Sequence, residues 1–463
     1  MTFTSINPYN QQTLTTYRAD GYVVIERKLK LADRAFTDWS GLSLAERVGY
    51  LRRVGEYLTV NKQVLGEQIT AEMGKTRREA VAEVEKCADG CVFYADHAEA
   101  FLADQVIKTD RGDGGAAFRA GHRTFVTYQP LGPVLAIMPW NFPYWQVFRF
   151  AIPGLLAGNV GLLKHAPNVF GCALAIEDVF RQCGLPDGVF QSLLIDVAPV
   201  KSLLKDRRVK AVTLTGSGRA GSSVAGIAGR EIKKSVLELG GSDALIVLAD
   251  ADLERAAETA VKSRMQNAGQ SCIAAKRFIV EKSVKKQFTE LLLHYIGQIR
   301  QGDPTDDAVT MGPMARPDLA DAIERQCRES VTKGAKLLTG SVQRDECNVQ
   351  PMLLDKVKPG MAAFDEETFG PLAALIEAKD EADAIRLANQ SDFGLGSALW
   401  TQDLDRADRL ARQIQAGSVF VNGLMRSDAR VPFGGIKNSG FGRELSEIGM
   451  KEFVNVKTVW TER

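Results

Sequence analysis

Hydrophobic residues recur at helical spacing through the first hundred positions, after a short extended start. Ser43 and Glu46 have the spacing of a capping box, and the apolar positions that follow lie three or four residues apart. These positions are Leu44, Val48, Leu51, Val54 and Leu58. Gly74 closes a second helical segment predicted over 62–73, and a third is predicted from 76 to about 105. The chain is therefore expected to begin as a helical region.

The pattern changes near residue 123, where short apolar runs begin to alternate with helical stretches. Residues 124–128 alternate like a strand. The apolar runs that follow cover 134–138, 161–163, 211–214, 236–239 and 244–248. A second series of runs starts at 277–280 and continues to 419–422, and the helical pattern over 250–268 separates the two series. Such alternation predicts parallel sheets built from βαβ units, with a domain boundary beside that helix.

Composition places the chain among soluble globular proteins. It has 463 residues, of which 45% are hydrophobic and 25% charged, so two or three domains with sizeable cores are expected. The 58 basic residues nearly balance the 57 acidic ones, which gives no electrostatic reason to bind nucleic acid or an anionic membrane. No secretory signal or apolar stretch of transmembrane length is visible.

Cysteine and histidine usage narrows the chemistry. The seven cysteines are irregularly spaced and odd in number, so a disulfide framework is not expected and a reducing cytoplasm fits better. The four histidines are scattered, with no pair at metal-ligand spacing to cysteines, so we predict no metal site.

A glycine-rich hexapeptide, Gly216–Gly221, offers one functional interpretation. It reads G-x-G-x-x-G, follows a strand-like run and precedes a helix-like one, as a pyrophosphate-binding turn would. Glu238 ends the next apolar run and could then grip a ribose hydroxyl, which would make the protein a conventional Rossmann reductase. A single hexapeptide in a chain with 42 glycines is weak evidence, so this remains an alternative.

A second interpretation starts from Cys272, which ends the segment Asn-Ala-Gly-Gln-Ser-Cys. Alone, such a cysteine is most often a small buried hydrophobic residue. Other segments change this: Pro-Trp-Asn-Phe-Pro at 139–143, Leu-Glu-Leu-Gly-Gly at 237–241, Glu-Glu-Thr-Phe-Gly-Pro at 366–371 and Pro-Phe-Gly-Gly at 432–435. In this order, over nearly the whole chain, they resemble the aldehyde dehydrogenase superfamily. The segments 138–147, 163–168 and 427–430 resemble the bacterial succinate-semialdehyde dehydrogenases most closely.

The resemblance implies a mechanism with a covalent intermediate. Cys272 matches the nucleophile, whose thiolate adds to the aldehyde carbonyl and, after hydride loss, carries a thioester. The Asn141 amide and the Cys272 backbone N–H match the donors to the oxyanion. Glu238 matches the general base that activates water to release the acid. A catalytically silent scaffold is not expected, because all three residues are present.

The resemblance also implies a nicotinamide cofactor. The matching positions are Trp140, Lys164, Ala166, Gly216, Ser217, Glu367 and Phe369. Among them, Lys164 matches the lysine that bonds the adenosine ribose, Ser217 the serine on the pyrophosphate, and Glu367 the carboxylate on the nicotinamide ribose. Many NAD-selective members carry a glutamate where this chain has Pro167, so a 2′-phosphate would meet no repulsion there.

The choice between NAD and NADP therefore stays open on the sequence. Lys164, His165 and Arg219 are the cationic candidates that could meet a 2′-phosphate. No dedicated phosphate clamp is obvious, so the balance favours NAD.

Substrate choice depends on arginines, because a guanidinium fork suits a carboxylate. Arg149, Ser427 and Arg430 are the predicted substrate residues, and succinate semialdehyde is the first candidate. Some relatives place an arginine six residues before the nucleophile, where this chain has Gln266, with Arg264 two residues further back. Other ω-carboxy aldehydes, such as glutarate semialdehyde, and general aliphatic aldehydes remain alternatives. The sequence assigns no role to Arg264 or to Ser242, which follows the Leu-Gly-Gly segment.

By resemblance the fold is α/β, with a Rossmann-type cofactor domain, an α/β catalytic domain and a small β oligomerisation element. The cofactor domain is expected to take residues 1–111 and 131–245, the catalytic domain 246–440, and the oligomerisation element 112–130 with 441–463. A cytoplasmic homodimer or homotetramer is the expected assembly.

Overall fold

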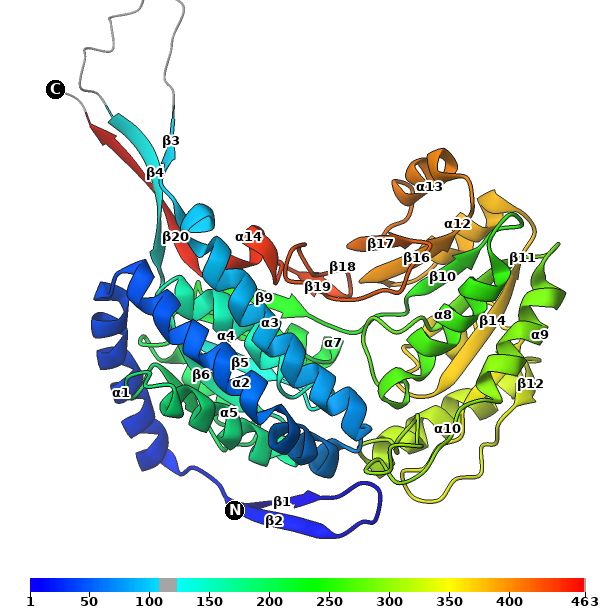
Figure 1. The fold of residues 1–463 in the computed structure, drawn as a ribbon, viewed down its shortest axis with the longest axis horizontal. Helices are drawn as coiled ribbons and strands as arrows, with labels where there is room; N and C mark the ends of the chain where they lie inside the picture. The colour runs from blue at the N-terminus through cyan, green and yellow to red at the C-terminus, as the bar shows by residue number, and fades with distance from the viewer. Residues whose placement is uncertain (108–122, 462–463) are drawn as a thin grey trace, which may run out of the picture.

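Two β-sheets, each covered by helices, contain most of the chain. The computed structural model describes residues 1–107 and 123–461. In Figure 1 the two sheets form separate lobes, and the long N-terminal helices pack on the lobe that contains β5 (Pro133–Met138), β6 (Val160–His165) and β9 (Lys234–Glu238). This is the α/β architecture that the alternation of apolar runs and helical patterns predicted.

The N-terminal region is a hairpin followed by three long helices. Strands β1 (Thr2–Ile6) and β2 (Thr13–Arg18) pair antiparallel. The helices are α1 (Tyr22–Gly41), α2 (Leu44–Met73) and α3 (Arg77–Leu102). The capping box predicted at Ser43 and Glu46 is confirmed, and Gly74 ends α2 with a left-handed φ of 86°. The prediction of a separate segment over 62–73 was wrong, because α2 contains no proline and its internal glycines do not cost enough to end it.

The first sheet has six strands in the order β19-β9-β8-β5-β6-β7, parallel except for β19. Its strands are β5 (Pro133–Met138), β6 (Val160–His165), β7 (Phe190–Ser192), β8 (Ala211–Thr215), β9 (Lys234–Glu238) and β19 (Gly440–Phe441). The connecting helices are α4 (Trp145–Leu156), η1 (Pro167–Val169), α5 (Phe170–Gln182), α6 (Val200–Lys205) and α7 (Gly218–Arg230). The chain reverses direction across the sheet between β5 and β8, where doubly wound sheets bind their ligands.

The second sheet has seven strands in the order β12-β13-β14-β11-β10-β16-β17, parallel except for β12. Its strands are β10 (Ala244–Val247), β11 (Arg277–Glu281), β12 (Lys336–Thr339), β13 (Met352–Asp355), β14 (Leu372–Ala378), β16 (Gly396–Trp400) and β17 (Ser418–Val421). Its helices are α8 (Leu253–Met265), η2 (Gln266–Gly269), α9 (Lys285–Ile296), α10 (Pro317–Thr332), α11 (Ala362–Asp365), α12 (Glu381–Asn389) and α13 (Leu404–Ala411). The chain enters this sheet at β10, two residues before the predicted domain boundary.

A third sheet projects from the first lobe and joins distant parts of the chain. It contains β3 (Gln105–Val106), β4 (Arg123–Pro130) and β20 (Val454–Thr461), all antiparallel. Figure 1 shows β4 and β20 extending away from both lobes, beyond the short helix α14 (Ser446–Met450). Residues 112–122 of the predicted oligomerisation element lie outside the described residues. A role in assembly for the part that is described stays a prediction.

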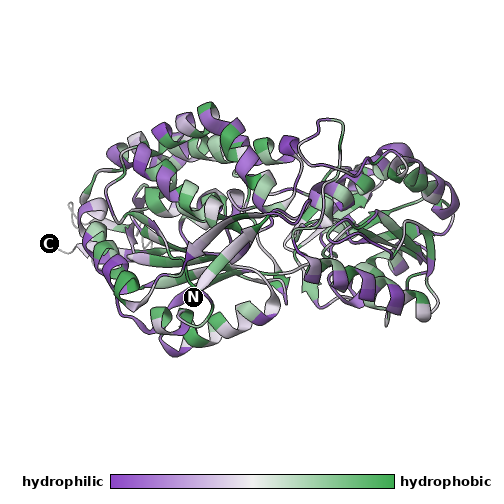
Figure 2. Ribbon diagram, turned by 90° about the horizontal axis from the view of Figure 1, so that it is seen from below, coloured by the Kyte–Doolittle hydropathy of each residue, from purple (hydrophilic) through white to green (hydrophobic). Residues whose placement is uncertain are grey.

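Two hydrophobic cores correspond to the two lobes. One core combines the N-terminal helices with the first sheet, and the other belongs to the second sheet. Phe433, Leu445, Met450 and Phe453 pack in the first core, so the chain returns to the first lobe after β17. The short strand pair β15 (Phe393–Gly394) and β18 (Ile436–Lys437) lies at this return. Figure 2 shows both lobes from below, with hydrophobic and hydrophilic residues alternating along the covering helices.

A helix that spans a membrane must be both long and strongly apolar. Among the residues that the structure describes, no helix combines the length and apolar character needed to cross a bilayer. The cytoplasmic location stays a prediction.

The cap at Gly74 makes a testable contribution to stability. A Cβ at this position would lie 2.8 Å from Pro8 Cγ and 2.9 Å from Pro313 Cγ, on backbone that non-glycine residues avoid. Gly74→Ala should therefore lower the free energy of unfolding by at least about 1–2 kcal/mol, the cost of left-handed backbone at one residue. The melting temperature by circular dichroism measures this.

Gly41→Ala is the matched control. Gly41 ends α1 with nothing within 4 Å of its ideal Cβ, so alanine should leave the melting temperature unchanged or raise it. An unchanged melting temperature in Gly74→Ala would contradict the account of this cap.

Candidate active site

The predicted site residues of the first sheet gather at one edge. Asn141 follows the end of β5, Lys164 lies near the end of β6, Ser217 follows β8, and Glu238 ends β9. These strands are parallel, so their carboxyl ends meet at the same edge, where open α/β sheets bind ligands. The edge faces the second lobe, from which Cys272 comes.

Cys272 lies just beyond a loop of unusual backbone. Asn267, Ala268 and Gly269 have φ values of 55°, 51° and 73°, so three consecutive residues are left-handed. Such backbone is costly for non-glycine residues and persists only where the surroundings enforce it. Gly269 has no alternative, because a Cβ there would lie 2.3 Å from the carbonyl oxygen of Gly370. The glycine in the Asn-Ala-Gly-Gln-Ser-Cys segment is thus needed for a close backbone approach.

Hydrogen bonds from several elements hold this loop. The backbone N–H of Asn267 donates to Glu79 Oε1 of α3 at 2.8 Å, and Asn267 Nδ2 donates to the carbonyl of Asn141 at 2.8 Å. Arg264, which is fully buried at the end of α8, donates to the carbonyl of Gly269. Arg264 therefore shapes the nucleophile loop, which is the role that the sequence did not reveal. Burial lowers its pKa to about 9, and nearby Glu367 opposes that shift.

Lys276 holds the backbone on the other side of Cys272. Its buried ammonium donates to the carbonyl of Ser271 at 2.9 Å and to the carbonyl of Cys272, and lies 3.5 Å from Glu367 Oε1. The peptide N–H of Cys272 itself donates to no acceptor among the described residues, so it stays available as an oxyanion donor. Neither Lys276 nor Arg264 was assigned a role by the sequence, because each acts on backbone.

Asn141 is buried and oriented by two bonds. Its Nδ2 donates to the carbonyl of Gln270 at 2.9 Å, and its Oδ1 accepts from Gln146 Nε2 at 2.9 Å. An amide nitrogen carries two hydrogens, so one remains for a substrate oxyanion. The start of α4 beside it is braced by Glu83, whose Oε1 accepts the N–H groups of Tyr144 at 2.8 Å and Trp145 at 3.0 Å.

The Cys272 thiol is protonated at rest. Burial raises its pKa to about 11, and the cationic Arg149 and Lys276 only partly oppose that effect. Catalysis through this sulfur therefore needs a base. The other six cysteines are also free thiols, and all of them are buried.

Glu238 is a buried carboxyl group without a hydrogen-bond partner. It is 2% exposed, and neither side-chain oxygen is bonded within the described residues. Burial, with Glu444 second, raises its pKa well above the usual value, while Arg149 opposes this. A Cβ on Gly434 would lie 2.6 Å from Glu238 Oε1, so the carboxyl lies against the Pro-Phe-Gly-Gly segment. This enclosed position is unsuited to gripping a ribose hydroxyl, as the reductase alternative requires.

Arg149 is engaged by the protein itself. Its Nε lies 2.7 Å from Glu444 Oε2, and both side chains are buried. Its Nη2 donates to Thr215 Oγ1 at 3.3 Å, and its guanidinium lies 4.6 Å from the centre of the Phe433 ring. The sequence did not single out Glu444, which lies 295 positions along the chain from Arg149. The Arg149 guanidinium, which was predicted to bind the substrate carboxylate, is thus already paired with Glu444.

A cavity of about 630 Å³ leads to Cys272 and contains several predicted residues. Its wall includes Arg149, Ser427 and Gln266, and also Lys86 of α3, which the sequence did not single out. Arg430 does not line it: its guanidinium is exposed and forms two hydrogen bonds to Asp428, at 2.8 and 2.6 Å. The structure therefore places Arg149 and Ser427 in one cavity with Cys272 but leaves Arg430 at the surface.

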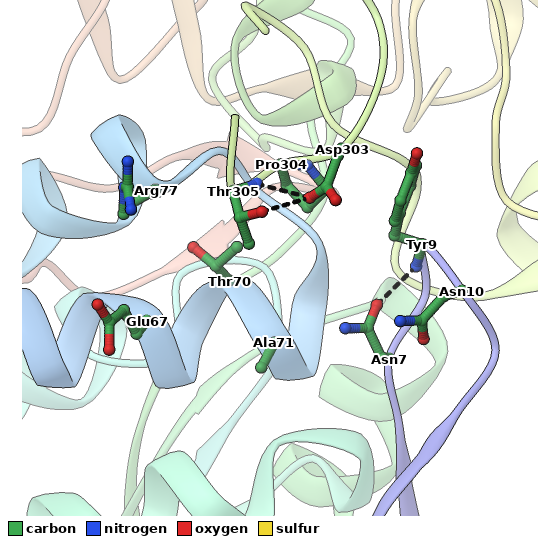
Figure 3. Close-up of a pocket in the computed structure, with 10 residues that line it drawn as sticks. All are labelled: Asn7, Tyr9, Asn10, Glu67, Thr70, Ala71, Arg77, Asp303, Pro304 and Thr305. Atoms are coloured by element: carbon green, nitrogen blue, oxygen red, sulfur yellow. Dashed lines mark hydrogen bonds between the residues drawn. The ribbon is translucent and has the colours of Figure 1, made fainter. Parts of the chain in front are cut away.

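A smaller pocket of about 360 Å³ lies between the N-terminal hairpin, the end of α2 and the loop at 303–305. Figure 3 shows its polar groups folded into local turns: Asp303 accepts from Thr305, and Asn7 accepts from the backbone of Tyr9. These bonds stabilise the loops themselves, so we assign the pocket no chemistry.

The expected cofactor residues fit a dinucleotide across the sheet edge. Ser217 caps α7, and a Cβ on Gly221 would lie 2.6 Å from Leu239 Cδ2, so α7 can pack close to β9 only with glycine there. The Lys164 ammonium makes no hydrogen bond to the described residues, and burial lowers its pKa. Such an unpaired cation beside Ala166 suits a ribose or a phosphate.

The nicotinamide end of the predicted cofactor site lies beside the nucleophile. Glu367 Oε1 accepts from the Gly241 N–H at 3.0 Å, and a Cβ on Gly240 would lie 2.3 Å from Glu367 Oε2. The paired glycines of Leu-Glu-Leu-Gly-Gly are thus needed for this approach. Trp140 and Phe369 meet edge to face, with ring centroids 5.9 Å apart. Over the described residues, no group of three His, Cys, Asp or Glu side chains could hold a metal ion.

The chain is similar to curated enzymes along its whole length. A protein of Synechocystis sp. named a probable succinate-semialdehyde dehydrogenase with NADP(+) is 47% identical, over 99% of this chain and 100% of its own. The Escherichia coli succinate semialdehyde dehydrogenase named for NAD(P)+ is 45% identical, over 99% of this chain and 98% of its own. A succinate-semialdehyde dehydrogenase of Mycobacterium tuberculosis named for NADP(+) is 44% identical, over 99% of this chain and 100% of its own.

Solved structures and a family model agree with these relatives. The succinic semialdehyde dehydrogenase of Streptococcus pyogenes, solved with NADP+, superposes with a TM-score of 0.95 at 34% identity, covering 100% of both chains. A succinate-semialdehyde dehydrogenase from Burkholderia pseudomallei superposes with a TM-score of 0.95 at 32% identity, covering 100% of this chain and 94% of the other. The Aldehyde dehydrogenase family model matches residues 1–459. The chain therefore belongs to the aldehyde dehydrogenase family, as its motifs predicted.

Proposed function

We propose that this protein oxidises succinate semialdehyde to succinate, with NADP as the hydride acceptor. One observation carries the proposal: the cavity that reaches the Cys272 thiol is also lined by Lys86, Arg149 and Ser427. A nucleophile and cationic or hydroxyl donors in one cavity suit an aldehyde whose other end is a carboxylate. The names of the relatives, at 44–47% identity, support the same substrate.

The reaction begins with proton loss from Cys272. The thiol has a pKa of about 11, while burial raises the pKa of the Glu238 carboxyl and so makes it a stronger base. The resulting thiolate adds to the aldehyde carbon, which converts the carbonyl oxygen into an oxyanion. Glu238 takes up the proton that the thiol loses.

The oxyanion is stabilised by donors that are already in place. The second N–H of Asn141 Nδ2 and the peptide N–H of Cys272 are the two groups in this role. Gln146 and Gln270 hold the Asn141 amide at 2.9 Å on either side, so little reorganisation is needed when charge develops. Loss of one such donor typically lowers turnover by about 10²–10³-fold.

A bound NADP supplies the acceptor for the hydride that leaves the aldehyde carbon. Lys164, Ala166, Gly216 and Ser217 would hold its adenosine and pyrophosphate part. Glu367, Trp140 and Phe369 would hold its nicotinamide part. The thioester that remains on the Cys272 sulfur must then be cleaved by water. Glu238 first releases the proton it took from the thiol to solvent, and as a carboxylate it then accepts a proton from the attacking water. The bond between carbon and sulfur breaks, which releases the acid and leaves Cys272 as a thiolate that regains a proton.

The structure supports NADP over the sequence's preference for NAD. The named cofactors of the relatives are NADP(+) or NAD(P)+, so the expectation of NAD is not confirmed. Pro167 offers no carboxylate against a 2′-phosphate. The buried Lys164 ammonium, three residues earlier in the chain, forms no hydrogen bond or ion pair with the described residues. His165 cannot contribute charge: burial lowers its pKa to about 4, and its Nε2 contacts the carbonyl of Pro143 at 2.9 Å.

Replacing Pro167 tests the cofactor proposal. Pro167→Glu puts a carboxylate in the first turn of η1, where a negative charge favours the helix, so the fold should be kept. The carboxylate should repel the 2′-phosphate and raise KM for NADP about tenfold or more, one such charge contact being on the order of 1.4 kcal/mol. KM for NAD should stay within about threefold. Steady-state kinetics with both cofactors measures this, and Pro167→Gln is the uncharged control.

A substrate panel tests the proposed function itself. Wild-type enzyme with NADP should give a kcat/KM for succinate semialdehyde at least about tenfold above that for butanal, because a charged hydrogen bond to the carboxylate is worth about that factor or more. Glutarate semialdehyde in the same panel shows whether the enzyme prefers the shorter or the longer ω-carboxy aldehyde. Cys272→Ala should abolish turnover of every substrate, whereas Cys347→Ala, at a buried thiol outside the site, should not. Equal kcat/KM for succinate semialdehyde and butanal would overturn the substrate proposal.

A further inference from the structure

The substrate carboxylate needs a cation that the protein has not already paired. Arg149, the strongest candidate from the sequence, lies 2.7 Å from Glu444, and both side chains are at least 96% buried. A buried ion pair of this kind is costly to break, because the partner left behind would be an uncompensated charge. Gln266, at the position where an arginine was sought, lines the cavity without a charge. The cation must therefore come from elsewhere on the cavity wall.

Arg78, Lys262 and Arg426 also line the cavity, but all three are exposed to solvent. Lys86 is half-buried on the cavity wall and is unpaired. It lies on α3, lines the cavity that reaches Cys272, and forms no ion pair with the described residues. Its ammonium lies 4.3 Å from the centre of the Trp145 ring, which holds it without neutralising its charge. It also donates to Ser427 Oγ at 2.9 Å.

The contacts of Ser427 direct its hydroxyl hydrogen away from its neighbours. Ser427 Oγ accepts from Lys86 Nζ at 2.9 Å and from Trp145 Nε1 at 2.8 Å. A hydroxyl oxygen has two acceptor positions and one hydrogen, so both acceptor positions are filled. The hydrogen is free for a third group, and Ser427 is a cavity residue. Lys86 and Ser427 thus form a pair of donors suited to the two oxygens of a carboxylate.

We infer that Lys86, together with Ser427, binds the terminal carboxylate of the substrate and determines the preference for ω-carboxy aldehydes. This inference rests on the proposed function and names the residue responsible for its specificity. Arg149 adds positive potential to the same cavity while it stays paired with Glu444. The assignment replaces the guanidinium fork expected from the sequence with an ammonium and a hydroxyl.

The surroundings of Lys86 give the interaction a pH dependence. Burial, then the positive charge of Arg149, lowers the pKa of Lys86 to about 8, while Cys87, Glu83 and Asp428 act in the opposite direction. Glu83 is already paired with Lys75, and Asp428 with Arg430. Lys86 is therefore charged below about pH 8 and neutral above it, so carboxylate recognition should weaken as the pH rises through that value.

Replacing Lys86 separates recognition from chemistry. Lys86→Met keeps an unbranched stem over Trp145 and removes the charge. It should lower kcat/KM for succinate semialdehyde about 10- to 100-fold, the range of a charged hydrogen bond. It should change kcat/KM for butanal, which has no carboxylate, by no more than about twofold. Lys86→Arg should retain most of the preference. Lys62→Met, which removes a lysine that pairs with Glu85 outside the cavity, is the matched control and should leave both values unchanged.

The pH dependence of the wild-type enzyme tests the role of Lys86 without replacing the residue. The ratio of kcat/KM for succinate semialdehyde to that for butanal cancels the titration of Cys272 and Glu238, which both substrates share. The ratio should fall as the pH rises through about 8, and it should stay flat in Lys86→Arg because arginine keeps its charge.

The outcomes distinguish this inference from the proposed function. A wild-type ratio near one at every pH would overturn the proposed substrate. A large wild-type ratio that Lys86→Met leaves unchanged, or that stays flat across about pH 6.5–9.5, would overturn only the role of Lys86. Equal losses for both substrates in Lys86→Met would show that the residue supports the structure rather than the specificity.

Discussion

Three left-handed residues, Asn267 to Gly269, set the geometry of the whole site. The run brings Cys272 from the second lobe to the sheet edge of the first, and such backbone is unfavourable unless neighbours enforce it. The enforcing bonds come from α3 through Glu79, from the segment after β5 through the carbonyl of Asn141, and from α8 through Arg264. The nucleophile loop therefore keeps its shape only while both lobes stay in register, so binding of cofactor and substrate between them needs little further ordering.

Desolvation dominates the electrostatics of the site. It raises the pKa of Cys272 to about 11 and that of the Glu238 carboxyl well above its usual value. In water the pKa of a carboxylic acid lies far below that of a thiol, so a carboxylate is a poor base for the thiol proton. Burial raises the pKa of the Glu238 carboxyl and so makes its carboxylate a stronger base. Arg149 acts on both groups, and its pairing with Glu444 limits how far it can stabilise the thiolate. A thiol that stays protonated until substrate is present is protected from oxidation and alkylation at rest.

Local signals in the sequence were enough to predict the α/β architecture, whereas Cys272, Asn141 and Glu238 were predicted as catalytic residues only from the family resemblance. Apolar runs marked most strands, and Ser43, Glu46 and Gly74 marked the ends of α2, because these effects depend on neighbouring residues. The three-residue strand β7 was not predicted, since Phe-Gln-Ser is too short and too polar to show a period. Resemblance identified Cys272, but its raised pKa depends on burial that no local pattern encodes.

Contacts between distant segments could not be predicted. The pairing of Arg149 with Glu444 and the bond of Lys86 to Ser427 join residues 295 and 341 positions apart. A charged residue on α3 looks like any solvated helix position until the loop that carries Ser427 packs against it. For the same reason Arg430 could not be recognised in advance as a surface residue paired with Asp428.

Alkylation of the free enzyme by iodoacetamide across a pH series tests the central claim most directly, namely that Cys272 is the nucleophile and is a protonated thiol at rest. The account predicts loss of activity in step with modification of Cys272, located by mass spectrometry. It also predicts a rate that rises about tenfold per pH unit between about pH 7 and pH 9.5 without levelling, since only the thiolate reacts. Full activity with Cys272 alkylated, or a rate that is already constant by about pH 7, would contradict it.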